Sequence, residues 1–290
     1  LILSGVLVGS VYGLIAMGFV IVYRSSRVFN MAYGQFAVLG SFVAWTFMGS
    51  PNAPRLPVSL ALFLTLLFAI AFGLLVERVL FRRMIGRPLF SSFILTLGML
   101  ALFNSIVMIV WGPNTLVFAQ TVPKGPVNIG GIVLAKEYIW TFFIAVAIVI
   151  AFVFFFRRTK LGLAIRAAYD HQVAAQCLGV SARLNSQIAW CLCTVLATAG
   201  GILVASVQGA SVILAEIVMV TLAIVLVGGL ESMEGCILGG LVLAIGENLA
   251  IYYLASYLPG VGGVVGVVLI LLVLIIRPSG LFGTKPVERV

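Results

Sequence analysis

Nine mostly apolar stretches follow one another along this chain, and they constrain its fold more than any other feature. A helix needs about 20 such residues to cross the hydrocarbon core of a bilayer. We predict spans at 1–23, 30–49, 58–77, 89–111, 138–156, 187–207, 212–229, 236–255 and 260–276. Only 9% of the residues are charged, against about a quarter in soluble domains, so the folded surface must face lipid. The predicted fold is therefore all-α, a polytopic transmembrane bundle of about 8–10 spans in a single domain covering residues 1–290.

The seventh stretch differs from the others because it is short enough to be a half-helix. Five glycines crowd its end and the start of the next stretch: Gly228, Gly229, Gly235, Gly239 and Gly240. We predict a broken helix near 212–240, which a membrane tolerates only where the backbone is buried or lines a cavity. A Pro- and Gly-rich segment at 112–136 is typical of a loop, and the spacing of Gly5, Gly9 and Gly13 predicts a helix-packing seam.

The basic residues give the orientation of the spans. Of the 17 Lys and Arg residues, 14 fall in alternate connections on one side, and Arg55, Lys124 and Lys136 fall on the other. Cytoplasmic loops carry the excess of Lys and Arg, so we predict an external N-terminus and a cytoplasmic C-terminus. The net charge of +9 is then an orientation signal and not a nucleic-acid surface.

Several kinds of chemistry find no support in the sequence. No G-x-x-x-x-G-K-[ST] motif occurs, so the chain has no phosphate-binding loop of that kind. His171 is the only histidine, and the four cysteines lack the spacing of a zinc or redox site. We expect no metal, no cofactor and no catalytic residue in this chain.

The longest predicted cytoplasmic connection, residues 157–186, is here named the knob. It is rich in alanine, which favours helix, and Gly179 is placed to end a helix. We predict a short helix, a stop at Gly179 and a second short helix from Ser181, with small side chains exposed. A helix lying on the lipid headgroups is the alternative, but it would carry large apolar residues on one face and lysines on the other. The residues favour docking to a cytoplasmic partner.

The knob contains the pattern G-L-A-I-R-A-A-Y-D-H-Q-V-A-A-Q-C-L-G-V, which resembles the coupling loop of permease subunits of branched-chain amino acid ABC importers. Three more segments agree with that family in order and spacing. Residues 22–42 resemble its N-x-A-x-G span, residues 226–240 its late Gly-rich turn, and residues 277–283 its C-terminal R-P-S-G-L-F-G tail. The chain departs from the family pattern at Arg24 and Arg27, at Tyr33-Gly34-Gln35, and at Glu231 and Glu234.

The resemblance implies a subunit of a heteromeric importer in the inner membrane of a bacterium. Its partners would be a second permease chain, expected to be a paralogue, two ATP-binding subunits that bind ATP and Mg, and a periplasmic solute-binding protein. The expected coupling residues in the knob are Arg166, Ala167, Asp170, Ala174, Ala175, Leu178, Gly179 and Val180.

Polar residues within the spans are candidates for the translocation pathway, because an ionisable group in a membrane is costly and is usually functional. The candidates are Asn30, Gln35, Thr96, Asn104, Gln208, Glu216 and Glu247. Interhelical hydrogen bonding is the alternative role for the neutral ones, and Glu247 could instead pair with a helix end or with the partner. We expect Glu77 to form an interfacial ion pair with its neighbour Arg78.

The sequence thus predicts a permease that imports branched-chain or related hydrophobic amino acids and is not itself an enzyme. Import of urea, short amides or aromatic acids by the same family is one alternative. An ion-coupled secondary transporter with Glu216 or Glu247 as proton carrier is another, but such a protein needs no docking knob.

Overall fold

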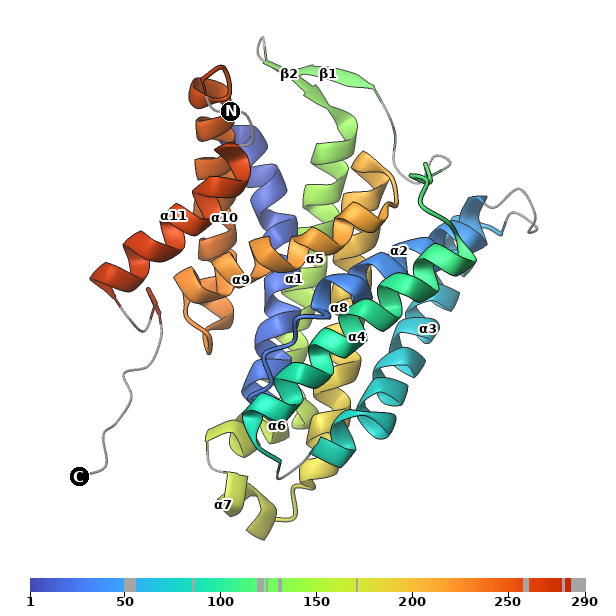
Figure 1. Ribbon diagram of the computed structural model, residues 1–290, viewed down its shortest axis with the longest axis vertical. Helices are drawn as coiled ribbons and strands as arrows, with labels where there is room; N and C mark the ends of the chain where they lie inside the picture. Colours follow the sequence, from blue (N-terminus) through green and yellow to red (C-terminus); the bar gives the residue numbers. More distant parts are fainter. Residues whose placement is uncertain are drawn as a thin grey trace.

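The structure is a computed structural model that describes residues 1–49, 56–84, 87–118, 123, 125–129, 132–170, 172–257, 261–277 and 280–282. It is a helical bundle (Figure 1), which confirms the predicted all-α polytopic class. The helices in its first part are α1 (Ile2–Ser26), α2 (Tyr33–Gly49), α3 (Val58–Val79), η1 (Phe81–Met84), α4 (Leu89–Val110) and α5 (Lys136–Arg158). The later ones are α6 (Lys160–Asp170), α7 (Gln172–Cys177), α8 (Ala182–Gln208), η2 (Val212–Glu216), α9 (Ile217–Gly228), α10 (Met233–Leu254) and α11 (Val261–Ile276).

Each of the nine predicted spans lies on helix, but they differ in length. Within the described residues, 6 helices are long and apolar enough to cross a membrane: α1, α3 with η1, α4, α5, α8 and α10. The seventh segment is short, as predicted, because it is divided into η2 and the 12-residue α9. One further segment is shorter than predicted, since α2 has 17 residues. The last helix, α11, has 16 residues and follows the predicted span from Val261 to Ile276.

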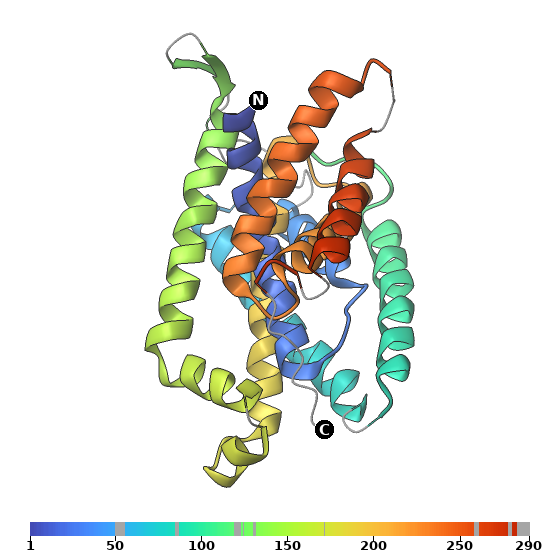
Figure 2. The same cartoon turned by 90° about the vertical axis from the view of Figure 1, so that its left-hand side faces the viewer.

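Two parts of the chain repeat the same order of elements in opposite directions. A long helix, a non-helical segment, a short helix and two further helices occur as α1–α4 and again as α8–α11. Figures 1 and 2 show α1 running from the end with the N-terminus toward the knob, whereas α8 runs back from the knob. The residue after each long helix has a positive φ, 56° at Arg27 and 88° at Gly209, which turns the chain back toward the centre.

The helices that follow the two non-helical segments, α2 and η2, meet inside the bundle. A Cβ atom on Gly34, in the first turn of α2, would overlap the carbonyl oxygen of Ala215 in η2, so the two backbones are in direct contact. The Tyr33 hydroxyl donates a hydrogen bond to the carbonyl oxygen of Ile15 in α1 at 2.6 Å. The interrupted backbone is therefore buried in protein, as a membrane environment requires.

The predicted glycine seam on α1 is confirmed, and it faces α10. A Cβ on Gly9 would lie 2.8 Å from the carbonyl oxygen of Gly240 and 2.9 Å from the Cα of Leu241. A Cβ on Gly5, one turn before, would lie 2.8 Å from the Cα of Ile245, and one on Gly13, one turn after, would lie 3.2 Å from the Cα of Ile237. Small residues let transmembrane helices approach in this way when lipid offers no hydrophobic driving force.

The segment predicted as a loop contains a β-hairpin instead of irregular chain alone. Strands β1 (Pro126–Ile129) and β2 (Ile132–Ala135) pair antiparallel, with Pro126 opposite Ala135. The hairpin projects at the opposite end of the bundle from α6 and α7 (Figure 2). Lys136, the first residue of α5, lies beside the hairpin, whereas Arg24, Arg78 and Arg157 lie in the last turns of α1, α3 and α5.

Candidate functional site

The knob extends beyond the spans at one end of the bundle, where α6 leaves the end of α5 at a steep angle (Figure 2). The Thr159 side-chain oxygen accepts a hydrogen bond from the Gly162 backbone N–H at 3.1 Å, which caps the first turn of α6. The inner face of α6 is anchored by Ile165, which is buried. The first helix of the knob is thus held firmly on the last turn of α5.

The second helix of the knob, α7, ends where the sequence predicts. Gly179 has φ +87°, its N–H donates to the Gln176 carbonyl at 3.0 Å, and the Val180 N–H donates to the Ala175 carbonyl at 2.9 Å. This pair of bonds is the Schellman motif, in which glycine supplies the left-handed residue. The prediction that Gly179 stops the helix is confirmed.

The tip of the knob presents small side chains and one large apolar one. Ala174, Leu178 and Gly179 are exposed, Leu178 to 85%, and Arg166, Ala167 and Val180 are partly buried. Ala175 is only 3% exposed, so it supports the tip from inside and does not belong to its surface. Asp170 is the last residue of α6, and His171 lies outside the described residues.

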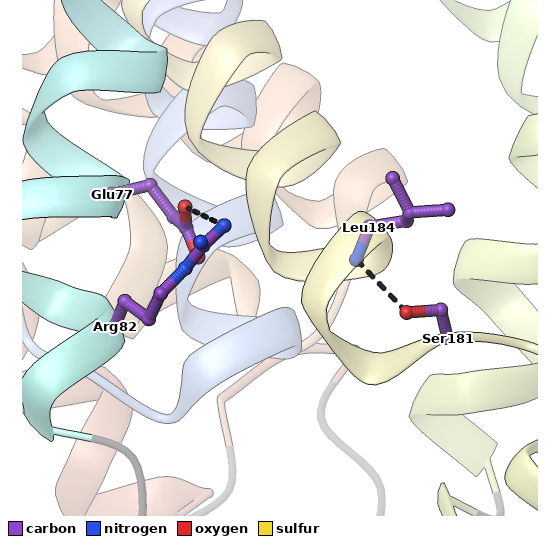
Figure 3. A network of polar contacts seen from close by, with 4 residues as sticks. All are labelled: Glu77, Arg82, Ser181 and Leu184. Carbon is purple, nitrogen blue, oxygen red and sulfur yellow. Dashed lines mark hydrogen bonds and ion pairs between the residues drawn. The ribbon is translucent and has the colours of Figure 1, made fainter.

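The predicted second short helix from Ser181 is wrong, because Ser181 caps the long helix α8. Its hydroxyl accepts a hydrogen bond from the Leu184 N–H at 3.5 Å (Figure 3), and the helix then continues to Gln208. No Gly or Pro occurs between Ala182 and Ala199 to end it. The knob is therefore joined directly to a helix that crosses the bundle.

The ion pair at the base of α3 also differs from the prediction. Glu77 is fully buried and pairs with Arg82 of η1 at 3.4 Å (Figure 3), not with Arg78. Consecutive residues on a helix point in different directions, so the neighbouring Arg78 cannot turn onto the same face. The pair lies where α3 packs against α8, close to the root of the knob.

Three of the seven candidate pathway residues share one cavity. Gln208, Glu216 and Glu247 line a cavity of about 740 Å³ between α8, α9, α10 and α11, a size typical of small-molecule sites. Tyr12 of α1 contributes a fourth polar group, and the remaining walls are largely aliphatic. The cavity combines carboxylate and amide oxygens with apolar walls, which suits a solute with both a cationic and an aliphatic part.

The other candidates lie apart from that cavity, and Asn30, Gln35 and Thr96 are at or near the start of α2. Asn30 is 1% exposed, and its side-chain oxygen accepts a hydrogen bond from the Ala32 N–H at 3.0 Å. Gln35 is 3% exposed, and Thr96 bonds to the Phe93 carbonyl at 2.8 Å within its own helix. Asn104 is partly buried on α4. These residues stay predictions for the pathway, with Asn30 stabilising the non-helical segment before α2.

The four motifs that carry the family resemblance come together at the knob end. Arg27, from the first motif, forms an ion pair with Glu231, from the Gly-rich turn. The C-terminal tail covers the end of α9, because Leu281 N–H donates to the Val227 carbonyl at 2.9 Å and Phe282 N–H to that of Gly228 at 3.1 Å. Segments more than 200 residues apart in the chain thus form one structural unit beside α6.

Sequence reasoning gave no role to two residues that the structure places in these sites. Tyr12 lines the cavity, and the signal for it is a polar hydroxyl within an otherwise apolar span. Tyr169 lies in the quoted knob motif, and its ring stacks under the Arg24 guanidinium at 4.1 Å. The sequence gave a signal for this region in its charged residues at 24, 27, 231 and 234. It did not show which of these residues contact one another or Tyr169.

Comparison with known proteins gives one family. Residues 1–276 match the family described as branched-chain amino acid transport system / permease component. The high-affinity branched-chain amino acid transport system permease protein BraD of Pseudomonas aeruginosa is 27% identical, over 100% of this chain and 97% of that protein. The protein LivH of Escherichia coli, with the same description, is 26% identical over 99% and 96%. A probable branched-chain amino acid transport permease of Methanocaldococcus jannaschii is 25% identical over 98% and 92%. No solved structure matches the chain.

Proposed function

Because this chain belongs to the family of branched-chain amino acid transport permeases, we propose that it forms the membrane pathway of an ATP-driven importer for leucine, isoleucine, valine and similar amino acids. The curated relatives that match it over nearly their whole length carry this substrate class in their names. The chain is a multi-pass membrane protein.

The shape of the knob supports ATP hydrolysis by separate subunits as the energy source. A chain without a phosphate-binding loop needs a separate motor, and the knob offers it an exposed tip of small side chains on two capped helices. The knob is continuous with α5 on one side and α8 on the other, so a force on the tip acts on two long helices. Two ATP-hydrolysing subunits that bind ATP and Mg would dock there, on the cytoplasmic side with the C-terminus.

The opposite end receives the solute. A second permease chain would complete the pathway, and a periplasmic binding protein would deliver the solute at the end with the β-hairpin. Inside, the cavity lined by Gln208, Glu216 and Glu247 supports the substrate class. Its carboxylates attract an ammonium group, while its aliphatic walls accept the side chain of a branched-chain amino acid.

The same two carboxylates are what a proton-coupled transporter would use, so the test must separate the energy sources. Uptake of radiolabelled leucine is measured in intact cells that contain the complete transporter, either with a protonophore while ATP stays high or with ATP depleted while the proton gradient stays. We expect uptake to survive the protonophore and to stop on ATP depletion. The reverse pattern would refute the proposal in favour of secondary transport.

A further inference from the structure

A second cluster of polar residues lies at the foot of α1, apart from the knob tip and from the pathway cavity. It lines a cavity of about 630 Å³ whose charged residues are Arg24, Arg157, Arg166, Glu231 and Glu234. They come from α1, α5, α6, the turn 229–232 and the first turn of α10. Apart from Arg166, a predicted coupling residue, these residues have no role in docking or solute transfer so far, and at Arg24, Glu231 and Glu234 the chain departs from its family pattern.

Tyr169, on the last turn of α6, is the residue that joins the knob to this cluster. Its ring lies 4.1 Å from the Arg24 guanidinium and 5.4 Å from that of Arg27, both within the range of cation–π attraction. Burial, together with the neighbouring Glu231 carboxylate, raises the pKa of Tyr169 to about 12. Tyr169 therefore stays protonated at physiological pH.

Arg27 completes the contact between α1 and the turn. Its guanidinium forms an ion pair with Glu231 and lies 5.7 Å from the Tyr23 ring. Burial opposes its charge, but the hydrogen bond to Glu231 and the charge of that carboxylate raise the pKa of Arg27 above its usual value. Arg27 thus contacts the Tyr169 ring of α6 and the Glu231 carboxylate of the turn at the same time.

The base of the knob is fixed to the same cluster at a second place. Arg166 of α6 donates to the Arg157 carbonyl at 3.3 Å, at the end of α5. Arg157 in turn pairs with Glu234 in the first turn of α10 at 2.6 Å. Two connections therefore run from α6 to the segment that begins α10.

The turn 229–232 connects the charged cluster to the interior of the bundle. It joins the half-helix α9 to α10, with Gly229 at φ +104° and with the Ser232 hydroxyl accepting the Gly235 N–H at 2.9 Å. The other end of α9 continues into η2, which contacts the start of α2 in the centre of the bundle. A single short helix, α9, therefore links this turn to the place where η2 meets α2.

We propose that Arg24, Arg27, Tyr169 and Glu231 form a coupling latch, through which displacement of α6 by the motor subunits moves the 229–232 turn and the half-helix α9. The latch residues are positioning residues: they touch neither the solute nor the nucleotide. This inference rests on the proposed function, because it needs a motor that moves the knob.

The exposure of the ion pairs argues against a purely structural role. The side chains of Arg27 and Glu231 are 50% and 23% exposed, and those of Arg157 and Glu234 are 63% and 74% exposed. Ion pairs so open to solvent contribute little to folding stability. Their removal is expected to leave the bundle folded, so a loss of transport would report on transmission of movement.

The test uses the intact transporter, purified with its ATP-hydrolysing subunits and placed in proteoliposomes. The variants are Arg27→Glu, Glu231→Arg and the double exchange of both, with Tyr169→Leu to remove the aromatic contact. The matched control is Arg158→Glu, a charge reversal at an exposed position next to Arg157, for which the described residues give no ion pair. Three quantities are measured: retention of the motor subunits, ATP hydrolysis without solute, and ATP-driven uptake of radiolabelled leucine.

We expect each single reversal and Tyr169→Leu to lower uptake by about 5–150-fold, the range of typical coupling between sites. Motor retention and solute-free hydrolysis should match the control, and the double exchange should recover most of the uptake. Uptake equal to the control in the single variants would overturn the latch, as would a double exchange without recovery. Loss of the motor subunits in the single variants would also overturn it, because the cluster would then belong to the dock. A different result would refute the proposed function, namely leucine uptake by the unaltered transporter that does not depend on ATP.

Discussion

Enlarging the tip of the knob tests whether small side chains are what the motor recognises. Ala174→Trp adds bulk on α7, and Gly179→Asn adds it at the turn. Both positions are exposed, and a Cβ atom on Gly179 meets no other atom of this chain within 4 Å. The added atoms therefore point away from the chain and into the space that a docked partner would occupy.

The choice of Asn at position 179 separates bulk from backbone strain. The φ of +87° penalises most side chains by about 1–2 kcal/mol, whereas Asn is several-fold enriched at such angles. Gly179→Ala should lower the thermal stability of the purified chain through strain while adding little bulk. Gly179→Asn should retain most of that stability. Overpacking at the contact costs about 1–3 kcal/mol, which lowers the affinity for the motor subunit about 5- to 150-fold.

The assay is retention of the ATP-hydrolysing subunits on affinity-purified permease, followed by titration of the motor subunit onto the purified chain. Asn114→Trp, at an exposed position before the hairpin and on the opposite end of the bundle, is the matched control and should bind normally. We expect Ala174→Trp and Gly179→Asn to reach the membrane in normal amounts and to lose the motor. Normal affinity in both variants would refute docking at the tip and favour a helix that lies on the headgroups.

Three further predictions concern topology and packing. A cysteine at Asn128 should react with an impermeant thiol reagent in intact cells once exposed Cys177 is replaced, and a cysteine at Ser181 should not; the reverse would invert the orientation. Gly9→Leu should destabilise the purified chain by about 1–3 kcal/mol or more through overpacking against α10, whereas Gly98→Ala, with no atom within 4 Å of its Cβ, should leave the melting temperature unchanged or higher. Arg82→Ala should cost about 3 kcal/mol by leaving Glu77 buried without its partner, and Arg83→Ala, at an exposed neighbouring position, should cost little in the same denaturation assay.

The features that the sequence could predict are those fixed by local physics. A helix must be long and apolar to cross a bilayer, so each predicted span coincides with helix. Gly179 ends α7 because only a residue tolerant of positive φ completes the Schellman turn. The i, i+4, i+8 spacing of Gly5, Gly9 and Gly13 puts them on one helix face whatever the partner helix is. These inferences need no knowledge of distant parts of the chain.

The features that were missed depend on contacts between distant segments. The non-helical stretch before Tyr33 was not predicted, although Asn30 helps to hold it through a local bond from the Ala32 N–H, because the contact of Gly34 with Ala215 of η2 comes from a distant part of the chain. The partner of Glu77 is decided by the fold of η1 after α3 ends, which brings Arg82 and not Arg78 onto its side. The charges at Arg27 and Glu231 are visible in the sequence, but 204 residues separate them, so their pairing could not be predicted.

Each interruption is covered by another part of the protein. A lipid bilayer cannot satisfy a free backbone N–H or C=O group, so a broken helix needs a buried segment to cover it. In this fold the backbone of Ala210 exchanges two hydrogen bonds of 2.8 Å with that of Leu116. The start of α2 and η2 pack directly against each other at Gly34 and Ala215, while the intact helices α1 and α8 pack beside them. The half-helix α9 has 12 residues and is therefore about 18 Å long, so its outer end reaches the 229–232 turn near the knob. The short helix α9 thus connects the latch residues to the buried non-helical segments. At these segments the backbone can change conformation without exposing its polar groups to lipid.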